Sequence, residues 1–353
     1  MADQPTEIIL GVDTHADIHV AAVLDHLGRL QGTLTIAATR AGSQQLLDWA
    51  GRHGRLIRAG VEGTGTYGAG LTRHLTQAGV QVVEVDRPNR QRRRRHGKSD
   101  PTDAEAAARA VLAGEATTTP KTRSGIVEAI RVLRVARSGA IKARTQAANQ
   151  LRDLLITGPD ELRAQLFPLS TVKRLARLAA AHPGPGDDPA TATRRALWHL
   201  ARRYQTLTTE LEALNADLTA LTRRAAPRLL ARPGIGVETA GTLLVTAGDN
   251  PGRLGSEAAL AALCGASPVQ ASSGKTTRHR LNRGGDRQAN NALWVITLTR
   301  LRIDPATRAY AQRRTTQGKT TKEIMRLLKR YLARELFPLL KADLDHAQQL
   351  NET

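Results

Sequence analysis

Short apolar runs alternate with polar segments over the first hundred residues, and they predict a layered sheet. The runs are brief and rich in Val, Ile and Thr where they predict strands, and they repeat every three or four residues where they predict helices. The pattern predicts strands at residues 8–13, 19–25, 32–39, 56–62 and 80–85, with helices at 41–53 and about 66–78. Three consecutive strands followed by alternating helices and strands predict an α/β domain with a mixed sheet, its first three strands antiparallel.

The middle of the chain is helical. Helices are expected at about residues 102–113 and 124–156, and a Gly/Pro-rich break follows at 182–189. After it, apolar residues recur at alternating spacings of three and four, at Leu197, Leu200, Tyr204, Leu207, Leu211, Leu214, Leu218 and Leu221. This heptad seam predicts a coiled-coil arm, formed within one chain or between chains. The alternative is a single helix packed on its own domain.

The last third combines a glycine-rich turn with further helices. The segment RPGIGVETAGTLL has the pattern of a helix–hairpin–helix element, in which Gly234 and Gly236 let backbone amides approach a phosphate. A plain Pro-Gly turn between helices is the alternative. A final helix is expected to pack through a core stripe of Ile324, Leu327, Leu328, Tyr331 and Leu332. The predicted C-terminal region is therefore mainly α-helical.

Charge narrows the possible partners. The chain of 353 residues carries 52 Lys and Arg against 32 Asp and Glu, a formal net charge of +20. Such an excess favours nucleic acid over an anionic membrane as partner, although a solvated basic surface is the plainer alternative. We find no apolar run near the length of a membrane span and no signal-peptide layout, so a cytoplasmic protein without a membrane partner is expected. One cysteine excludes an intramolecular disulfide.

A glycine pattern in the first domain raises a cofactor hypothesis. Gly63, Gly65 and Gly68 spell G-x-G-x-x-G, and Glu84 and Asp86 follow where a ribose-binding acid would lie. A dinucleotide fold would place this turn after its first strand, whereas here it follows a later strand. The position of the turn therefore argues against a dinucleotide site and draws attention to the glutamate before it.

Four carboxylates stand where strands end or a helix begins. Asp13 and Glu62 each end a predicted strand, and Asp100 and Asp103 lie three apart at a helix start. If they converge, their repulsion requires a cation, and two Mg²⁺ ions about 4 Å apart would suit phosphodiester chemistry. Each acid alone could be a helix cap or a surface residue. His15 and His19 lack partners at zinc-ligand spacing and are interpreted as non-zinc residues.

Basic residues gather near two of these features. Phosphate contacts are predicted for two basic segments. The first lies just before Asp100 and holds Arg92, Arg93, Arg94, Arg95 and Lys98. The second is a polar segment after residue 265 and holds Lys275, Arg278, Arg280 and Arg283. In the second segment, Ser272 and Ser273 precede Gly274 and Lys275. A serine among fixed cations can attack a phosphodiester, although SSGKTT could equally be a flexible phosphate-binding loop.

Several segments together carry a family resemblance. GVDTH, VEGTGTYG, KSDPTDAEAAARA, RPGIGVETAGTLL, GASPVQASSGKT and NRGGDRQANNAL follow one another in the order typical of one family. The chain resembles the DEDD transposases of bacterial insertion sequences, relatives of the Piv DNA invertase that act as RNA-guided DNA recombinases. GASP departs from the commoner Gly-Leu-x-Pro of that family, which concerns packing more than chemistry.

The resemblance implies an architecture and a site. It implies a RuvC-like (RNase H-like) catalytic domain over residues 1–155, a helical coiled-coil region over 156–226 and a C-terminal transposase domain over 227–353. By position, Asp13, Glu62, Asp100 and Asp103 correspond to the metal-binding tetrad. Ser273, with Ser272 as the alternative, corresponds to a nucleophile that forms a phosphoserine bond to DNA.

The expected activity is therefore DNA cleavage and rejoining with Mg²⁺ and a serine nucleophile. The resemblance further implies donor and target DNA, an element-encoded guide RNA, and a homo-oligomer that builds the site from acids of one protomer and the serine of another. One alternative is a RuvC-like endonuclease in which metal-activated water attacks. Another is a non-catalytic nucleic-acid scaffold.

Overall fold

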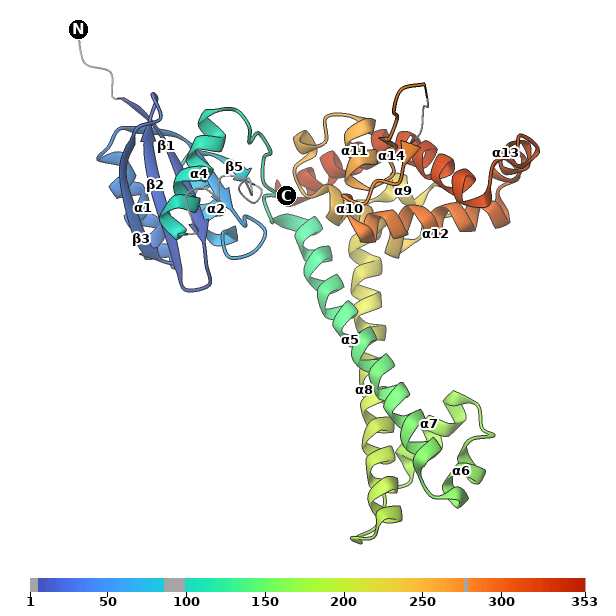
Figure 1. The fold of residues 1–353 in the computed structure, drawn as a ribbon. Helices are drawn as coiled ribbons and strands as arrows, with labels where there is room; N and C mark the ends of the chain where they lie inside the picture. The colour runs from blue at the N-terminus through green and yellow to red at the C-terminus, as the bar shows by residue number, and fades with distance from the viewer. Residues whose placement is uncertain (1–5, 86–98, 276–278, 353) are drawn as a thin grey trace. The chain divides into compact units, whose positions relative to one another are not determined.

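A computed structural model describes residues 6–85, 99–275 and 279–352 of the chain. The polypeptide forms two compact units (Figure 1). The first comprises Met1–Arg123 with the short segment Gly248–Arg253, and the second comprises Ser124–Ala247 with Leu254–Thr353. Each unit is described below by itself.

The first unit is built on a five-stranded mixed sheet of order β3-β2-β1-β4-β5. Its strands are β1 (Glu7–Thr14), β2 (Ile18–Asp25), β3 (Leu30–Ala37), β4 (Arg55–Glu62) and β5 (Gln81–Val85). β1, β2 and β3 are antiparallel neighbours, whereas β4 pairs parallel to both β1 and β5. The predicted mixed sheet with three antiparallel strands is confirmed, and its topology is that of an RNase H-like domain.

Helices cover both faces of this sheet. α1 (Arg40–Gly51) and α2 (Ala69–Gln77) pack on the face formed by Ile8, Leu10 and Val12 of β1. α4 (Asp100–Leu112) packs on the opposite face. Side chains of a strand alternate between faces, so the residues between those three point toward α4. The edge at which β1 ends and α4 begins is where the acidic residues lie.

A long helical hairpin opens the second unit. α5 (Gly125–Thr157) and α8 (Pro189–Ala225) run side by side in opposite directions (Figure 1), and the short helices α6 (Asp160–Leu166) and α7 (Thr171–Ala180) lie between them in sequence. At one end Leu151 and Leu155 of α5 share a core with Leu197 of α8. At the other end Ile130 shares a core with Leu218.

The heptad seam of α8 faces α5. The seam residues Leu197, Leu211 and Leu218 are buried. Tyr204, which lies between the first two of them, is half-buried beneath the guanidinium of Arg144. The intervening positions, Leu200, Leu207, Leu214 and Leu221, are half-buried. The predicted coiled-coil arm thus forms within the chain, and its use between chains stays a prediction.

The rest of the second unit is a helical body with a small hairpin. Its elements are α9 (Pro227–Leu230), α10 (Val237–Ala247), α11 (Glu257–Leu263), α12 (Arg287–Ile303), α13 (Pro305–Thr316), α14 (Thr321–Glu352), and strands β6 (Val269–Gln270) and β7 (His279–Arg280). The core joins α5, α9, α10 and α12 to Leu336, Leu340 and Leu344 of α14. None of the described helices combines the length and apolarity needed to cross a membrane.

The domain limits expected from the sequence differ from the limits of the two compact units. Residues 124–155 were grouped with the sheet in the sequence-based division, whereas α5 packs on α8, α10 and α14 of the second unit. The heptad region and the C-terminal region, divided at residue 226, share one core. A division into three functional domains remains a proposal.

Candidate catalytic site

Two carboxylates come from neighbouring parallel strands. Val12 of β1 lies beside Val61 of β4, so the next residues, Asp13 and Glu62, reach the same edge of the sheet. The Thr14 hydroxyl donates a 2.8 Å hydrogen bond to the Glu62 carbonyl and links the two strand ends. Asp13 is buried and Glu62 is half-buried. The two strand ends are therefore neighbours, and the convergence of all four carboxylates on one point stays a prediction.

Two glycines bring α4 close to these strands. Gly11 and Gly60 stand two residues before Asp13 and Glu62, and strand alternation puts each glycine and its acid on the α4 face. A Cβ at Gly11 would lie 2.0 Å from the Ala104 carbonyl oxygen, and one at Gly60 would lie 2.7 Å from the Ala107 carbonyl oxygen. Only glycine permits this approach, so the repeated glycine–valine–acid pattern sets how near the helix lies to the carboxylates.

The first turn of α4 supplies the other two acids. Ser99 precedes the helix in extended conformation, and Pro101 occupies its first turn, where a missing N–H has no cost. Asp103 is only 3% exposed and belongs to the stripe, with Ala104 and Ala107, that packs on the sheet. Asp100 is half-buried one turn earlier on the same side. The helix therefore begins at Asp100, two residues before the predicted start.

His15 lies beside two of the acids, a position that the sequence alone did not predict. Its Nε2 atom lies 3.3 Å from Asp13 Oδ2 and 3.5 Å from Asp100 Oδ2. Among the residues that the structure describes, ligand atoms of Asp13, His15 and Asp100 all fall within 4.8 Å of one another, which suits a metal ion. Two carboxylates and an imidazole fit a divalent cation such as Mg²⁺ or Mn²⁺. The available signal was the Asp-x-His spacing at the end of a strand.

His19 has a different environment. It is 3% exposed on β2, opposite Thr14 in register and on the α1–α2 face of the sheet. Burial lowers the pKa of its imidazole, because the charged form loses its hydration. Its interpretation as a non-zinc residue stays a prediction.

Close packing of α4 leads to a first testable prediction. We expect Gly11→Ala to displace α4, to lower the free energy of unfolding by about 1–3 kcal/mol and to weaken divalent-metal binding, because the added methyl group meets helix backbone. Denaturant unfolding and Mn²⁺ titration measure the two effects. Gly51→Ala is the matched control, since a Cβ there has nothing within 4 Å. Unchanged stability and metal affinity in Gly11→Ala would contradict the packing argument.

The glycine-rich turn is held by contacts within the first unit. Gly63 has a φ of +70°, and a Cβ at Gly65 would lie 2.8 Å from the Arg123 guanidinium. Glu84 accepts a 2.8 Å hydrogen bond from the Thr64 hydroxyl and pairs with Arg253 at 3.5 Å. The acid considered for a ribose therefore braces this turn. Asp86 lies outside the described residues, and the mixed sheet differs from a doubly wound dinucleotide fold.

The candidate nucleophile lies in the turn between β6 and β7. Ser272 and Ser273 are both exposed, and Gly274 has a φ of +53°. Gln270 donates a 3.4 Å hydrogen bond to the Ser272 hydroxyl. Lys275, Arg280 and Arg283 are described, whereas Arg278 and the basic residues Arg92, Arg93, Arg94, Arg95 and Lys98 lie outside the described residues.

A basic pocket of about 660 Å³ lies at the foot of this hairpin. His279, Arg280, Lys319, Arg326 and Arg330 line it together with Lys329. Lys329 is buried and donates a 2.9 Å hydrogen bond to Asn290 Oδ1, and burial lowers the pKa of its ammonium group. Behind it, Cys264 is fully buried, and desolvation raises the pKa of its thiol to about 12, so this thiol is a core residue.

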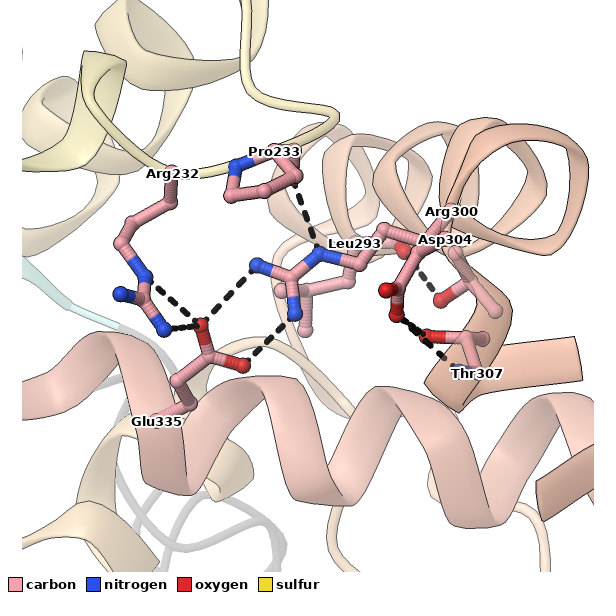
Figure 2. A network of polar contacts seen from close by, with 8 residues as sticks. Arg232, Pro233, Leu293, Arg300, Asp304, Thr307 and Glu335 are labelled. Carbon is pink, nitrogen blue, oxygen red and sulfur yellow. Dashed lines mark hydrogen bonds and ion pairs between the residues drawn. The ribbon is translucent and has the colours of Figure 1, made fainter. Parts of the chain in front are cut away.

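An ion-pair network braces the predicted helix–hairpin–helix turn (Figure 2). Arg300 donates to the Pro233 carbonyl at 2.9 Å and pairs with Glu335 at 2.7 Å. Arg232 pairs with the same carboxylate at 2.9 Å. Hydrogen bonds from Arg300 and Arg232 lower the pKa of Glu335 despite its burial.

The turn itself has some features that favour phosphate binding and others that oppose it. Gly234 has a φ of +79°, and the Gly236 N–H donates to the Thr239 hydroxyl at 3.1 Å. Glu238 adds a negative charge to the first turn of α10, which Arg134 and Arg137 offset at 2.9 and 3.1 Å. Phosphate binding by this turn stays a prediction.

Comparisons with known proteins agree with this arrangement. Residues 10–157, which contain all four acids, match a model of DEDD transposases of the IS110 type described as "Transposase". Residues 226–312, which contain both candidate serines, match a model described as "Transposase IS116/IS110/IS902 family".

Two curated relatives come from bacterial insertion elements. The chain is 36% identical over 132 residues to an "Insertion element IS110 uncharacterized 43.6 kDa protein" of Streptomyces coelicolor, covering 36% of this chain and 32% of the relative. It is 30% identical over 151 residues to an "Insertion element IS900 uncharacterized 42 kDa protein" of Mycobacterium paratuberculosis, covering 42% and 37%. These alignments span about a third of each relative. One family model matches the N-terminal part of the chain and the other matches the C-terminal part, in the same chain. The chain therefore belongs to the IS110 family of transposases.

Proposed function

We propose that this protein cuts and rejoins DNA during movement of an insertion sequence. The observation that carries the proposal is the grouping of Asp13, His15 and Asp100 at the end of an RNase H-like sheet. Membership of the transposase family supports the same activity, and the formal charge of +20 suits a nucleic-acid substrate.

The four acids are proposed to bind two Mg²⁺ ions between them. Asp13 and Glu62 would bind from the strand ends, and Asp100 and Asp103 from α4. The bound ions would supply charge stabilisation at the phosphate and at the departing oxygen. Oxygen ligands from carboxylates are those that Mg²⁺ prefers, and His15 would orient Asp13 and Asp100 or take a coordination position itself.

The serine hairpin is proposed to supply the attacking group. The Ser273 oxygen would form a bond to phosphorus while the bond between phosphorus and one deoxyribose oxygen breaks. The serine proton leaves to a base or water, and the freed deoxyribose oxygen takes up a proton. Attack by the end of a second strand reverses these changes, so strands are exchanged without net hydrolysis.

Partners follow from the same proposal. Donor and target DNA would both be substrates, and an RNA encoded by the element would choose their sequences. A homo-oligomer would bring the acids of one protomer to the serine of another, with the α5–α8 hairpin as the contact. The RNA part is tested by sequencing RNA that copurifies with the protein, which should map to DNA flanking its gene.

Metal removal tests the core of the proposal. Purified protein, incubated with that flanking RNA and plasmids carrying the element's junction and target, should give strand exchange and a detergent-resistant protein–DNA adduct in Mg²⁺. EDTA should abolish both products while DNA binding in a gel-shift assay persists. Equal exchange in EDTA would refute a metal-dependent site. Cleavage that leaves free hydrolysed ends and no adduct would favour the endonuclease alternative.

A further inference from the structure

We propose that a pocket between α12, α13 and α14 binds one unpaired nucleotide of a nucleic-acid strand. The pocket encloses about 540 Å³, within the range of small-molecule sites. It is lined by Thr297, Arg300, Asp304, Ala306, Thr307, Tyr310, Arg313, Arg314, Leu328, Tyr331, Leu332 and Glu335. It lies in the second unit and uses neither the acidic residues nor the serine hairpin.

Two tyrosines form the aromatic part of this pocket. The chain has four tyrosines, and Tyr310 of α13 meets Tyr331 of α14 here, with ring centroids 5.4 Å apart and planes at 78°. Tyr331 keeps 48% of its surface exposed, so its predicted place in the core stripe of this helix is wrong. Its ring remains accessible to another planar group. A nucleobase is planar and stacks on tyrosine whatever its sequence. Aromatic residues make up only 3% of the chain, and two of them meet in this pocket.

Two arginines give the pocket a cationic rim. The guanidinium carbons of Arg314 and Arg313 lie 5.2 and 5.9 Å from the centre of the Tyr310 ring. The Arg314 Nε–H also donates a 3.1 Å hydrogen bond to the Tyr310 hydroxyl, which fixes one guanidinium beside the ring. Arginine beside an aromatic ring can bind a phosphate while the ring stacks on the base.

The floor of the pocket is already paired. Figure 2 shows Glu335 between Arg300 and Arg232, and Asp304 receiving the Thr307 hydroxyl and its backbone N–H. Arg300 and Arg232 offset the charge of Glu335. Asp304 caps α13 through neutral donors and keeps its charge. The lining still has a net positive charge, because Arg300, Arg313 and Arg314 outnumber Asp304 and Glu335. A preformed floor and a cationic, aromatic rim suit an anion that carries a flat ring, which is the chemistry of a nucleotide.

α13 itself contributes little to folding. All twelve of its residues are described, and none is buried. Its half-buried residues Thr307, Tyr310, Ala311 and Arg314 form one stripe that faces the neighbouring helices, and a stripe with no fully buried side chain gains little from packing. Its one concentration of specific contacts is around Tyr310, where it faces α14. A ligand-binding role accounts for a helix that the core does not require.

Binding of a single strand tests the proposal. The probes are fluorescein-labelled 15-nucleotide oligo(dT), oligo(U) and a 15-base-pair duplex, titrated with full-length protein at constant salt. Tyr331→Ala is expected to weaken single-strand binding about tenfold, from loss of one stacked base, with less than twofold change for the duplex. Tyr331→Phe should retain wild-type affinity, because it keeps the ring. If only one single-strand probe loses affinity, oligo(dU) of the same length separates the effect of the sugar from that of the thymine methyl group.

A second pair of variants separates the pocket from general charge. Arg314→Ala should weaken single-strand binding, whereas Arg308→Ala should not, although it removes the same charge from the same exposed helix outside the pocket. Thermal unfolding should be the same for all variants. Equal losses for Arg314→Ala and Arg308→Ala, or unchanged single-strand affinity in Tyr331→Ala, would overturn the proposal. Neither result bears on strand exchange, so the proposed function is tested separately.

Discussion

Ser273→Ala is expected to abolish strand exchange and the protein–DNA adduct together. The alanine lacks the oxygen that would bond to phosphorus, so no covalent intermediate can form. DNA binding should persist, because the serine is an exposed turn residue and the surrounding basic side chains remain. Adduct formation on a radiolabelled DNA strand, resolved in detergent gels, measures the effect directly.

The neighbouring serine provides the matched control for this variant. Ser272→Ala makes the same chemical change one position away in the same exposed turn. It should leave the adduct in place, with the modified peptide carrying Ser273. Full recombination by Ser273→Ala together with loss in Ser272→Ala would transfer the nucleophile to Ser272. Full recombination by the double variant would exclude a serine intermediate from this turn.

Asp13→Asn is expected to reduce strand exchange by about 100- to 1,000-fold, the size of effect seen when one electrostatic contact to the reacting charge is removed. The amide keeps the shape of the side chain but loses its negative charge, and with it the attraction for a divalent ion. Mg²⁺ should then raise the unfolding temperature of the variant less than that of the wild type, since ligand binding stabilises the folded state.

Asp17→Asn is the control for this effect. Asp17 lies in the exposed turn after β1 and is not among the residues grouped around His15. It should retain both strand exchange and stabilisation by Mg²⁺, while DNA binding stays unchanged in both variants. Wild-type exchange by Asp13→Asn would contradict a metal role for Asp13. DNA binding without exchange in the wild-type protein would instead support the non-catalytic scaffold.

Much of the first unit was predictable because its signals are local. The short apolar runs of β1 and β2 and the acids at strand ends are visible in the order of residues, and the sheet confirms the strands. His15 was not predicted, because its neighbour Asp100 is brought beside it only by the packing of α4. The importance of Gly11 also depends on that packing, since its missing Cβ matters only where the Ala104 backbone approaches.

The second unit shows where sequence patterns stop being informative. The heptad spacing predicted the long helix α8, but the seam alone could not show that α5 would cover it. Tyr310 and Tyr331 belong to different helices and meet only because the chain turns between α13 and α14. The bracing of Pro233 by Arg300 likewise joins residues that share no periodic pattern.

The position of α14 in the core also constrains how the chain folds during synthesis. Asp343 is fully buried and accepts the Arg228 and Leu229 backbone N–H groups, and Leu336, Leu340 and Leu344 complete the core begun by Ile126 of α5. A ribosome must therefore make α14 before the apolar surfaces of α5, α9 and α10 are covered. Until then the nascent second unit is exposed to aggregation and to chaperones, while the sheet unit can already fold.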